Sequence, residues 1–155
     1  MARQRFWFSC LAAAFALAAV AGGAAAKDGA VEVDVELVLA VDISYSMDPD
    51  EQRLQREGYA QAITSEQFLN ALRGGPYGRV AIVYMQWAAA RDQDVLLPWT
   101  VIDGPETARA FAERLLEAPY RRAQRTSLSG AIDAAMKLFD GNGFQGLRRV
   151  IDVSG

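Results

Sequence analysis

The sequence predicts an α/β fold in which helices cover both faces of a mostly parallel sheet with one antiparallel edge strand. Two apolar runs, 37–41 and 80–83, have the length and the branching of strands that are buried on both faces. Longer segments with helix signals separate the predicted strands, and only one link is too short to hold a helix. The 155 residues are enough for one small domain of this kind and too few for two.

The first 26 residues are predicted to be a secretory signal peptide. Arg3 and Arg5 precede an apolar stretch from Phe6 to Val20, and small residues follow it up to Ala26. We expect cleavage after Ala26 and an exported protein, periplasmic or secreted, that has no membrane attachment after cleavage. The alternative is a retained membrane anchor, but the stretch is alanine-rich and shorter than the roughly 20 residues that a spanning helix needs.

The composition excludes several classes of function. Loss of Arg3 and Arg5 with the signal peptide takes the net charge from −3 to −5, which disfavours nucleic acid as a partner because phosphates attract clustered positive charge. The chain has no histidine, and its one cysteine, Cys10, lies in the signal peptide. This excludes histidine-based catalysis and the usual zinc sites within the chain. A metal bound here would have oxygen ligands, as Mg²⁺, Mn²⁺ and Ca²⁺ prefer.

The predicted domain begins with a strand. Residues 27–35 form a polar leader and the start of this strand, and the domain proper covers 36–155. Apolar and acidic residues alternate over 31–36 before the continuous apolar run 37–41. We therefore expect a strand that is half exposed where it begins and that then enters a core between helices.

A turn rich in side-chain oxygen follows this strand. Asp42, Ser44 and Ser46 occupy alternate positions, so that their side chains can point the same way at the carboxyl end of the strand. Open α/β sheets bind their ligands at this end. A helix then begins, with Asp48 as its N-cap and Pro49 at its first position. A plainer interpretation is that these oxygens only cap the turn and the helix.

The helical segment that follows runs from Pro49 to about Leu72. We expect a break near Gly58 or near Ser65, which can cap the second piece, and a glycine-rich turn over 74–78. The side chains expected on the buried side are Leu54, Tyr59, Ile63, Phe68, Leu69 and Leu72.

A hairpin comes next in the predicted order. Its strands are Arg79–Trp87 and Asp94–Thr100, and the link between them is too short for a helical crossover, so they are antiparallel. Pro98 cannot donate to a ladder, which places the second of these strands at a sheet edge. Trp87 and Trp99 are expected to pack in the core or along the edge, with a ligand platform as the alternative.

Two helices and a strand complete the prediction. One helix opens at Asp103 and ends before Pro119, another starts at Ser127 or Ser129, and the last strand covers Arg149–Val153. The expected buried faces are Ala108, Phe111, Ala112 and Leu115 on the first helix, and Leu128, Ile132, Ala135, Met136 and Phe139 on the second.

The pattern D-x-S-x-S after an apolar strand resembles the metal-ion-dependent adhesion site (MIDAS) of von Willebrand factor type A (VWA) domains. The order strand, helix, hairpin, helix, helix, strand also resembles the first two-thirds of such a domain. A more specific similarity covers 36–155, in the segments DPDEQRLQREGYA, GPYGRVAIVYMQW, VLLPWTVIDGPE, RTSLSGAIDAA and RRVIDVSG. These segments resemble an exported bacterial family known as domain of unknown function 1194, which has no established activity.

The resemblance implies a Rossmann-like VWA sheet with a divalent-cation site. Ser44 and Ser46 would bind the ion through their hydroxyl groups, Asp42 mainly through a water molecule, and Thr126 directly or through water. In VWA domains an aspartate that follows the fourth strand is a further ligand. In this sequence it would correspond to the position after Gly155. We therefore expect a C-terminally truncated copy, without the last strands, in which the Mg²⁺, Mn²⁺ or Ca²⁺ site can stay empty.

Two functions of different classes are compatible with this site. We favour a binding module without catalysis, in which the ion engages an acidic residue of a protein partner. The alternative is a metal-assisted hydrolase or phosphatase that uses Asp42 as its nucleophile. Against it, phosphotransfer aspartates usually have a second acid two residues on, where this chain has Ser44.

Residues around the predicted site also have two interpretations. Arg121, Arg122 and Arg125 are either a solvated basic loop, which we favour, or a guide for an acidic partner. Tyr45, between the two serines, is expected to be exposed at the rim and to be available to a partner.

Overall fold

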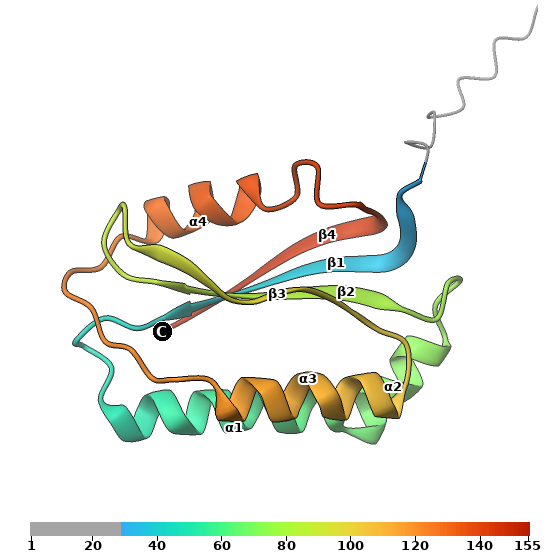
Figure 1. Ribbon diagram of the computed structural model, residues 1–155, viewed down its shortest axis with the longest axis horizontal. Coiled ribbons are helices and arrows are strands. Elements are labelled where there is room, and N and C mark those ends of the chain that lie inside the picture. Colours follow the sequence, from blue (N-terminus) through green and yellow to red (C-terminus); the bar gives the residue numbers. More distant parts are fainter. Residues whose placement is uncertain (1–28) are drawn as a thin grey trace, which may run out of the picture.

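The computed structural model of this protein describes residues 29–155, so the predicted signal peptide, 1–26, lies outside the described residues. A four-stranded sheet separates α4 on one face from α1, α2 and α3 on the other (Figure 1). The elements in chain order are β1 Val31–Asp42, α1 Pro49–Thr64, α2 Glu66–Arg73, β2 Val80–Trp87, β3 Gln93–Ile102, α3 Pro105–Glu117, α4 Leu128–Lys137 and β4 Phe144–Ser154.

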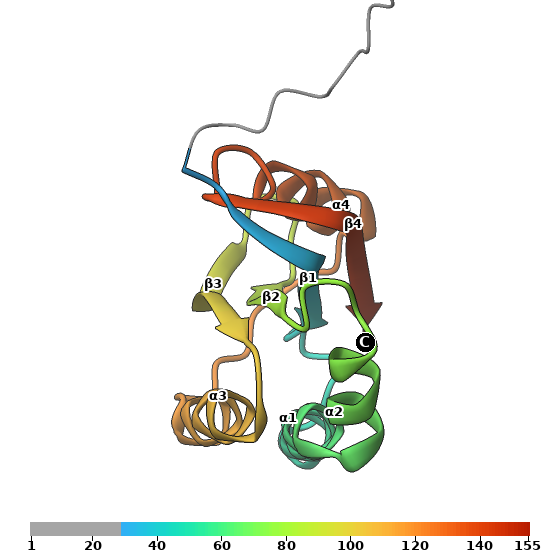
Figure 2. The same cartoon turned by 90° about the vertical axis from the view of Figure 1, so that its right-hand side faces the viewer.

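The strand order is β3-β2-β1-β4, with β1 parallel to both of its neighbours and β3 antiparallel to β2. Leu37 is paired with Ile82 of β2 on one side and with Val150 of β4 on the other. The predicted antiparallel hairpin is confirmed, and so is the placement of the Pro98 strand at an edge. Figure 2 shows how the strands twist between the two helical layers.

The core has two halves, one on each face of the sheet. Leu39 and Val41 of β1 point toward α1, α2 and α3, whereas Val38 and Ala40 point toward α4. Every residue of β2 is buried. A strand covered on both faces needs apolar side chains at successive positions, which explains the continuous apolar runs in the sequence.

The break in the first helical segment lies at Ser65 and not at Gly58. Ser65 Oγ accepts a hydrogen bond from the amide of Phe68 and caps α2, and Asp48 caps α1 as predicted. The prediction for Leu54 is wrong, because this side chain is exposed. The buried stripe of α1 begins instead with two polar residues, Gln52 and Arg56.

The predicted face of α4 is also partly wrong. Ala131, Ala135 and Phe139 are buried, whereas three other apolar side chains point outward. The reason is close packing: a Cβ on Gly130 would lie 2.8 Å from Ala90 Cα, so α4 approaches the β2–β3 loop along its small residues. The outward side chains are Leu128, Ile132 and Met136.

The last strand begins earlier than predicted, at Phe144 and not at Arg149. Its first residues pair with the amino end of β1, where Val31 lies opposite Phe144. Within 29–155, no helix has both the length and the apolar character that crossing a bilayer requires.

Candidate metal centre

The structure brings three of the four predicted ligands together at the carboxyl end of β1. The Ser44 amide donates to Asp42 Oδ1 at 2.7 Å, and the Ser44 hydroxyl donates to Asp42 Oδ2 at 3.1 Å. Ser44 Oγ and Ser46 Oγ lie 2.5 Å apart. Asp42 and Ser44 are buried and Ser46 is exposed, so the chain of oxygens leads from the sheet to the surface.

Local sequence explains this geometry. β1 continues past Asp42 through a bond from the Ile43 amide to the Trp87 carbonyl, and the chain then turns where the Met47 amide donates to Ser44 O. The Asp48 carboxylate accepts from the amide of Glu51, whose own side chain accepts from the Asp48 amide, and this capping box starts α1. The oxygen-rich turn is therefore fixed at both of its ends.

A second loop, between α3 and α4, runs beside this turn. The Ala123 amide donates to Ile43 O at 2.9 Å, and the Tyr45 amide donates to Ala123 O at 3.0 Å. Thr126, the fourth predicted ligand, lies on this loop and is exposed. The structure thus brings the Thr126 loop to the turn, but no hydrogen bond within the described residues joins Thr126 itself to the other three side chains.

The chemistry of the candidate ligand atoms fits a small, hard cation. One carboxylate and two hydroxyl groups supply only oxygen atoms, which Mg²⁺ and Mn²⁺ accept. Neighbouring ligands of octahedral Mg²⁺ lie roughly 3 Å apart, so the two hydrogen-bonded serine oxygens, 2.5 Å apart, would need to separate only slightly to share one ion. Residues 29–155 contain no group of three or more His, Cys, Asp or Glu side chains that could hold a metal in another way.

Gly155 contacts the candidate site, although no sequence pattern predicted a role for it. A Cβ on Gly155 would lie 2.5 Å from Asp42 Cβ and 3.0 Å from Asp42 Oδ2. Only glycine fits at this distance, so the backbone after β4 packs directly against the carboxylate. No sequence pattern reports such a contact, because it depends on the parallel pairing of β1 with β4.

The rim of the site carries Tyr45, which is exposed as predicted. Arg122 donates to Tyr45 O at 2.9 Å, and its guanidinium carbon lies 4.9 Å from the centroid of the Tyr45 ring. Arg121 forms an ion pair with Asp92 at 2.7 Å. Two of the three loop arginines are therefore engaged within the chain, and the loop is not simply solvated.

The two tryptophans of the hairpin pack with α4. Trp87 belongs to the core cluster of Val38, Ala40, Val83 and Met85, and Trp99 packs against that cluster. Trp99 Nε1 donates to the Leu138 carbonyl at 3.1 Å. This agrees with the predicted packing role.

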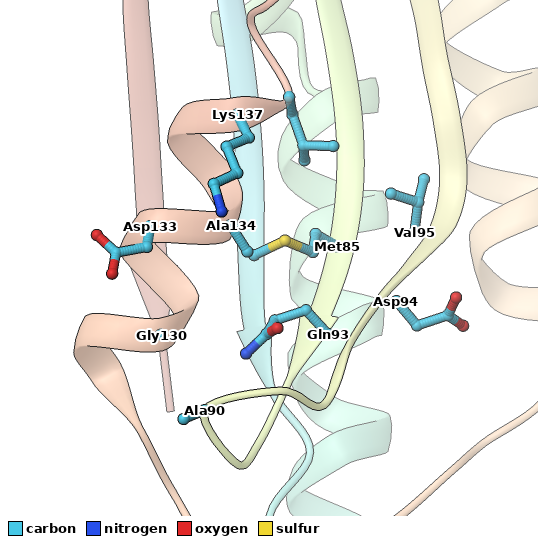
Figure 3. A pocket seen from close by; sticks show the side chains of 10 residues that line it. Met85, Ala90, Gln93, Asp94, Val95, Gly130, Asp133, Ala134 and Lys137 are labelled. Carbon is cyan, nitrogen blue, oxygen red and sulfur yellow. The ribbon is translucent and has the colours of Figure 1, made fainter.

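A groove of about 390 Å³ lies elsewhere, between α4 and the β2–β3 hairpin (Figure 3). Met85 is buried in it, and Asp94, Asp133 and Lys137 are exposed along it. None of the predicted metal ligands lines this groove. We therefore place the candidate site at the oxygen cluster of Asp42, Ser44 and Ser46, where the candidate ligand atoms converge.

Parts of several solved structures resemble this chain in fold. Three N-terminal domains of the type V pili tip protein Mfa5 from Porphyromonas gingivalis match with a TM-score of 0.51 and 15% identity, over 78% of this chain and 19% of that one. Proximal thread matrix protein 1 from the mussel byssus matches with a TM-score of 0.51 and 11% identity, over 80% of this chain and 30% of that one. At these identities the likeness shows the fold alone.

The vWF domain of Mfa5 matches with a TM-score of 0.48 and 14% identity, over 79% of this chain and 37% of that one. The chain thus spans less than two thirds of each of these solved chains. No curated protein matches it. The predicted α/β fold, a mostly parallel sheet with one antiparallel edge strand and helices on both faces, is confirmed. The family described as "Protein of unknown function (DUF1194)" matches residues 32–155, and the chain therefore belongs to this family.

Proposed function

We propose that this protein is an exported, non-catalytic binding module that uses a divalent cation to engage an acidic residue of a protein partner. Asp42, Ser44, Ser46 and Thr126 would hold the ion, with Mg²⁺ or Mn²⁺ preferred and Ca²⁺ as another candidate. The observation that carries the proposal is the continuous chain of oxygens from Asp42 to Ser46 at the carboxyl end of the central strand.

The charge of the site explains the choice of partner. Asp42 is the one carboxylate among the four proposed ligands, so a bound dication would keep a net positive charge. A small dication also keeps open or water-filled positions, which a carboxylate of a partner can occupy. Arg122 beside Tyr45 adds positive charge at the rim.

The proposed location is outside the cytoplasm, either periplasmic or secreted. The predicted signal peptide supports it, and so does the fold likeness to Mfa5, which is described as a pili tip protein. We propose no nucleic acid partner and no membrane attachment after cleavage.

The hydrolase alternative has less support. Both oxygens of Asp42, its proposed nucleophile, accept hydrogen bonds from Ser44. No observation on residues 29–155 adds a general base to the site.

A thermal-shift experiment on the full chain tests the metal. Mg²⁺ or Mn²⁺ should raise the melting temperature of the wild type, and Ser44→Ala combined with Ser46→Ala should abolish the rise. Ser129→Ala, an exposed serine on α4, is the matched control and should keep it. An equal rise in the double variant would refute these ligands, and Mg²⁺-dependent phosphatase turnover that Asp42→Ala removes would replace binding with catalysis.

A further inference from the structure

Arg56 of α1 is an arginine that the fold buries almost completely. Its exposed fraction is 2%, although guanidinium groups normally face water. Nη2 donates to the Pro119 carbonyl at 2.8 Å, Nη1 donates to the Ala118 carbonyl, and the guanidinium carbon lies 4.0 Å from the centroid of the Tyr120 ring. Tyr84 lines the same narrow gap as Arg56.

These contacts hold the end of another helix. Ala118 is the C-cap of α3, whose last carbonyls have no partner within the helix and carry the negative end of its dipole. The planar guanidinium binds two successive carbonyls at once, which fixes a direction as well as a distance. Among the described residues, no carboxylate forms an ion pair with Arg56, so these carbonyls and the aromatic ring are what its charge meets.

The two segments that Arg56 joins are the two that carry the proposed ligands. α1 starts directly after the turn of Ser44 and Ser46, and Arg56 lies about two helical turns from its cap. The loop that starts at Ala118 pairs with Ile43 and Tyr45 through Ala123 and reaches Thr126 three residues later. Arg56 and Asp42 also line the same narrow gap behind the site.

We propose that Arg56 is a positioning residue of the metal centre. Its guanidinium fixes the 118–127 loop against the turn after β1 and so sets where Thr126 stands relative to Ser44 and Ser46. Lysine cannot replace it, because an ammonium group is a single point of charge and cannot hold two carbonyls and an aromatic face in one plane. The metal part of this inference depends on the proposed function, whereas the positioning of the loop does not.

Amide hydrogen exchange in the metal-free full chain tests the positioning of the loop. In Arg56→Lys, the amides of Tyr45 and Ala123 should exchange at least about an order of magnitude faster than in the wild type, because their mutual bonds open more often. The Gly146 amide, which lies on β4 and donates to Glu36 in the amino half of β1, should keep its rate once global stability is corrected for. Unchanged rates at Tyr45 and Ala123 would overturn the inference without bearing on the metal.

Calorimetric titration with Mn²⁺ tests the consequence for the site. Arg56→Lys and Arg56→Met should each weaken Mn²⁺ binding about tenfold or more, while Arg53→Lys, an exposed arginine of the same helix, should leave it unchanged. Glu36→Gln, far from the site, controls for lost stability and should also bind normally. If Arg56→Met does not fold, Tyr120→Ala takes its place, since this exposed ring can be removed at lower cost.

The two failures are distinguishable. A wild type that takes up no Mn²⁺ would overturn the proposed function and the metal part of this inference together, and the exchange experiment would still decide whether Arg56 positions the loop. A wild type that binds Mn²⁺ and an Arg56→Lys variant that binds it equally well would overturn the inference, even if the loop amides exchanged faster.

Discussion

The amino half and the carboxyl end of β1 each bury an acidic side chain, but they bind it in opposite ways. In the amino half, Glu36 accepts hydrogen bonds from the Gly146 amide at 2.8 Å and from the Asn142 side chain at 2.7 Å. At the carboxyl end, the bonds to Asp42 come from Ser44, two residues away. The exposed fractions are nearly equal, 0% for Glu36 and 4% for Asp42.

The difference teaches that burial alone does not separate a structural acid from a functional one. Donors from more than 100 residues away satisfy Glu36, so the carboxylate joins β1 to the turn before β4. Asp34 acts in the same way on the turn before β2, accepting from the amides of Tyr77 and Arg79. Asp42 joins nothing distant through these bonds; it organises hydroxyl groups that lead to the surface.

The largest expected effect is that of Glu36→Ala. Removing this carboxylate leaves the Gly146 amide and the Asn142 side chain without their acceptor, which should lower the free energy of unfolding by roughly 3 kcal/mol or more. Urea denaturation measures it. A loss as small as that of an exposed substitution would remove the structural half of the comparison.

Asp42→Ala should lower the stability of the fold less than Glu36→Ala does, but it should abolish metal binding. In metal-free protein it removes two local bonds, for an expected loss of about 1–2 kcal/mol. The rise in melting temperature on adding Mg²⁺ should disappear completely. If metal-free Asp42→Ala were less stable than Glu36→Ala, the carboxyl end would be a structural centre as well.

Tyr59→Phe tests a link between α1 and β4. The Tyr59 hydroxyl lies 2.7 Å from Asp152 Oδ2 and 2.8 Å from Ser154 Oγ, and its loss should cost about 1 kcal/mol. Burial raises the pKa of Tyr59 from 10.0 to about 12, so its contribution is complete below pH 10 and is lost as the pH rises toward 12. Urea midpoints across this window should fall less in Tyr59→Phe than in the wild type.

The smallest effect is expected for Glu32→Gln, in the same half of β1 as Glu36. Glu32 is exposed, and its side chain accepts a 3.1 Å bond from the Tyr77 hydroxyl, which a glutamine oxygen can also accept. The urea midpoint should not change within error. A clear loss of stability would show that position along β1, rather than burial and distant donors, decides which acids matter.

Much of the fold could be predicted because its causes are local. The apolar runs of β1 and β2 gave both central strands, Pro98 placed β3 at an edge, and Ser65 marked the break before α2. The predictions were wrong where contacts between residues far apart in the sequence determine the structure. The start of β4 is fixed by bonds between Glu36 and residues 142–146, which no local pattern contains.

The predictions of which helix faces are buried were wrong for a related reason. The buried stripe of α1 includes Gln52 and Arg56, so apolar periodicity placed the exposed Leu54 inside instead. At the site, the spacing of Asp42, Ser44 and Ser46 was enough to predict their convergence. The role of Arg56 could not be predicted from the sequence, because its hydrogen-bond partners lie 62 and 63 residues further along the chain.

Nuclear magnetic resonance of the full chain with Mn²⁺ tests the central claim most directly, because the paramagnetic ion broadens the signals of nearby amides. We predict broadening centred on residues 42–46 and 123–127, none at Gly146 or at the Arg79 amide, and loss of the effect in Asp42→Ala. Broadening centred on the acids at the amino end of β1 or on the groove beside Asp133, or no broadening at all, would contradict the account.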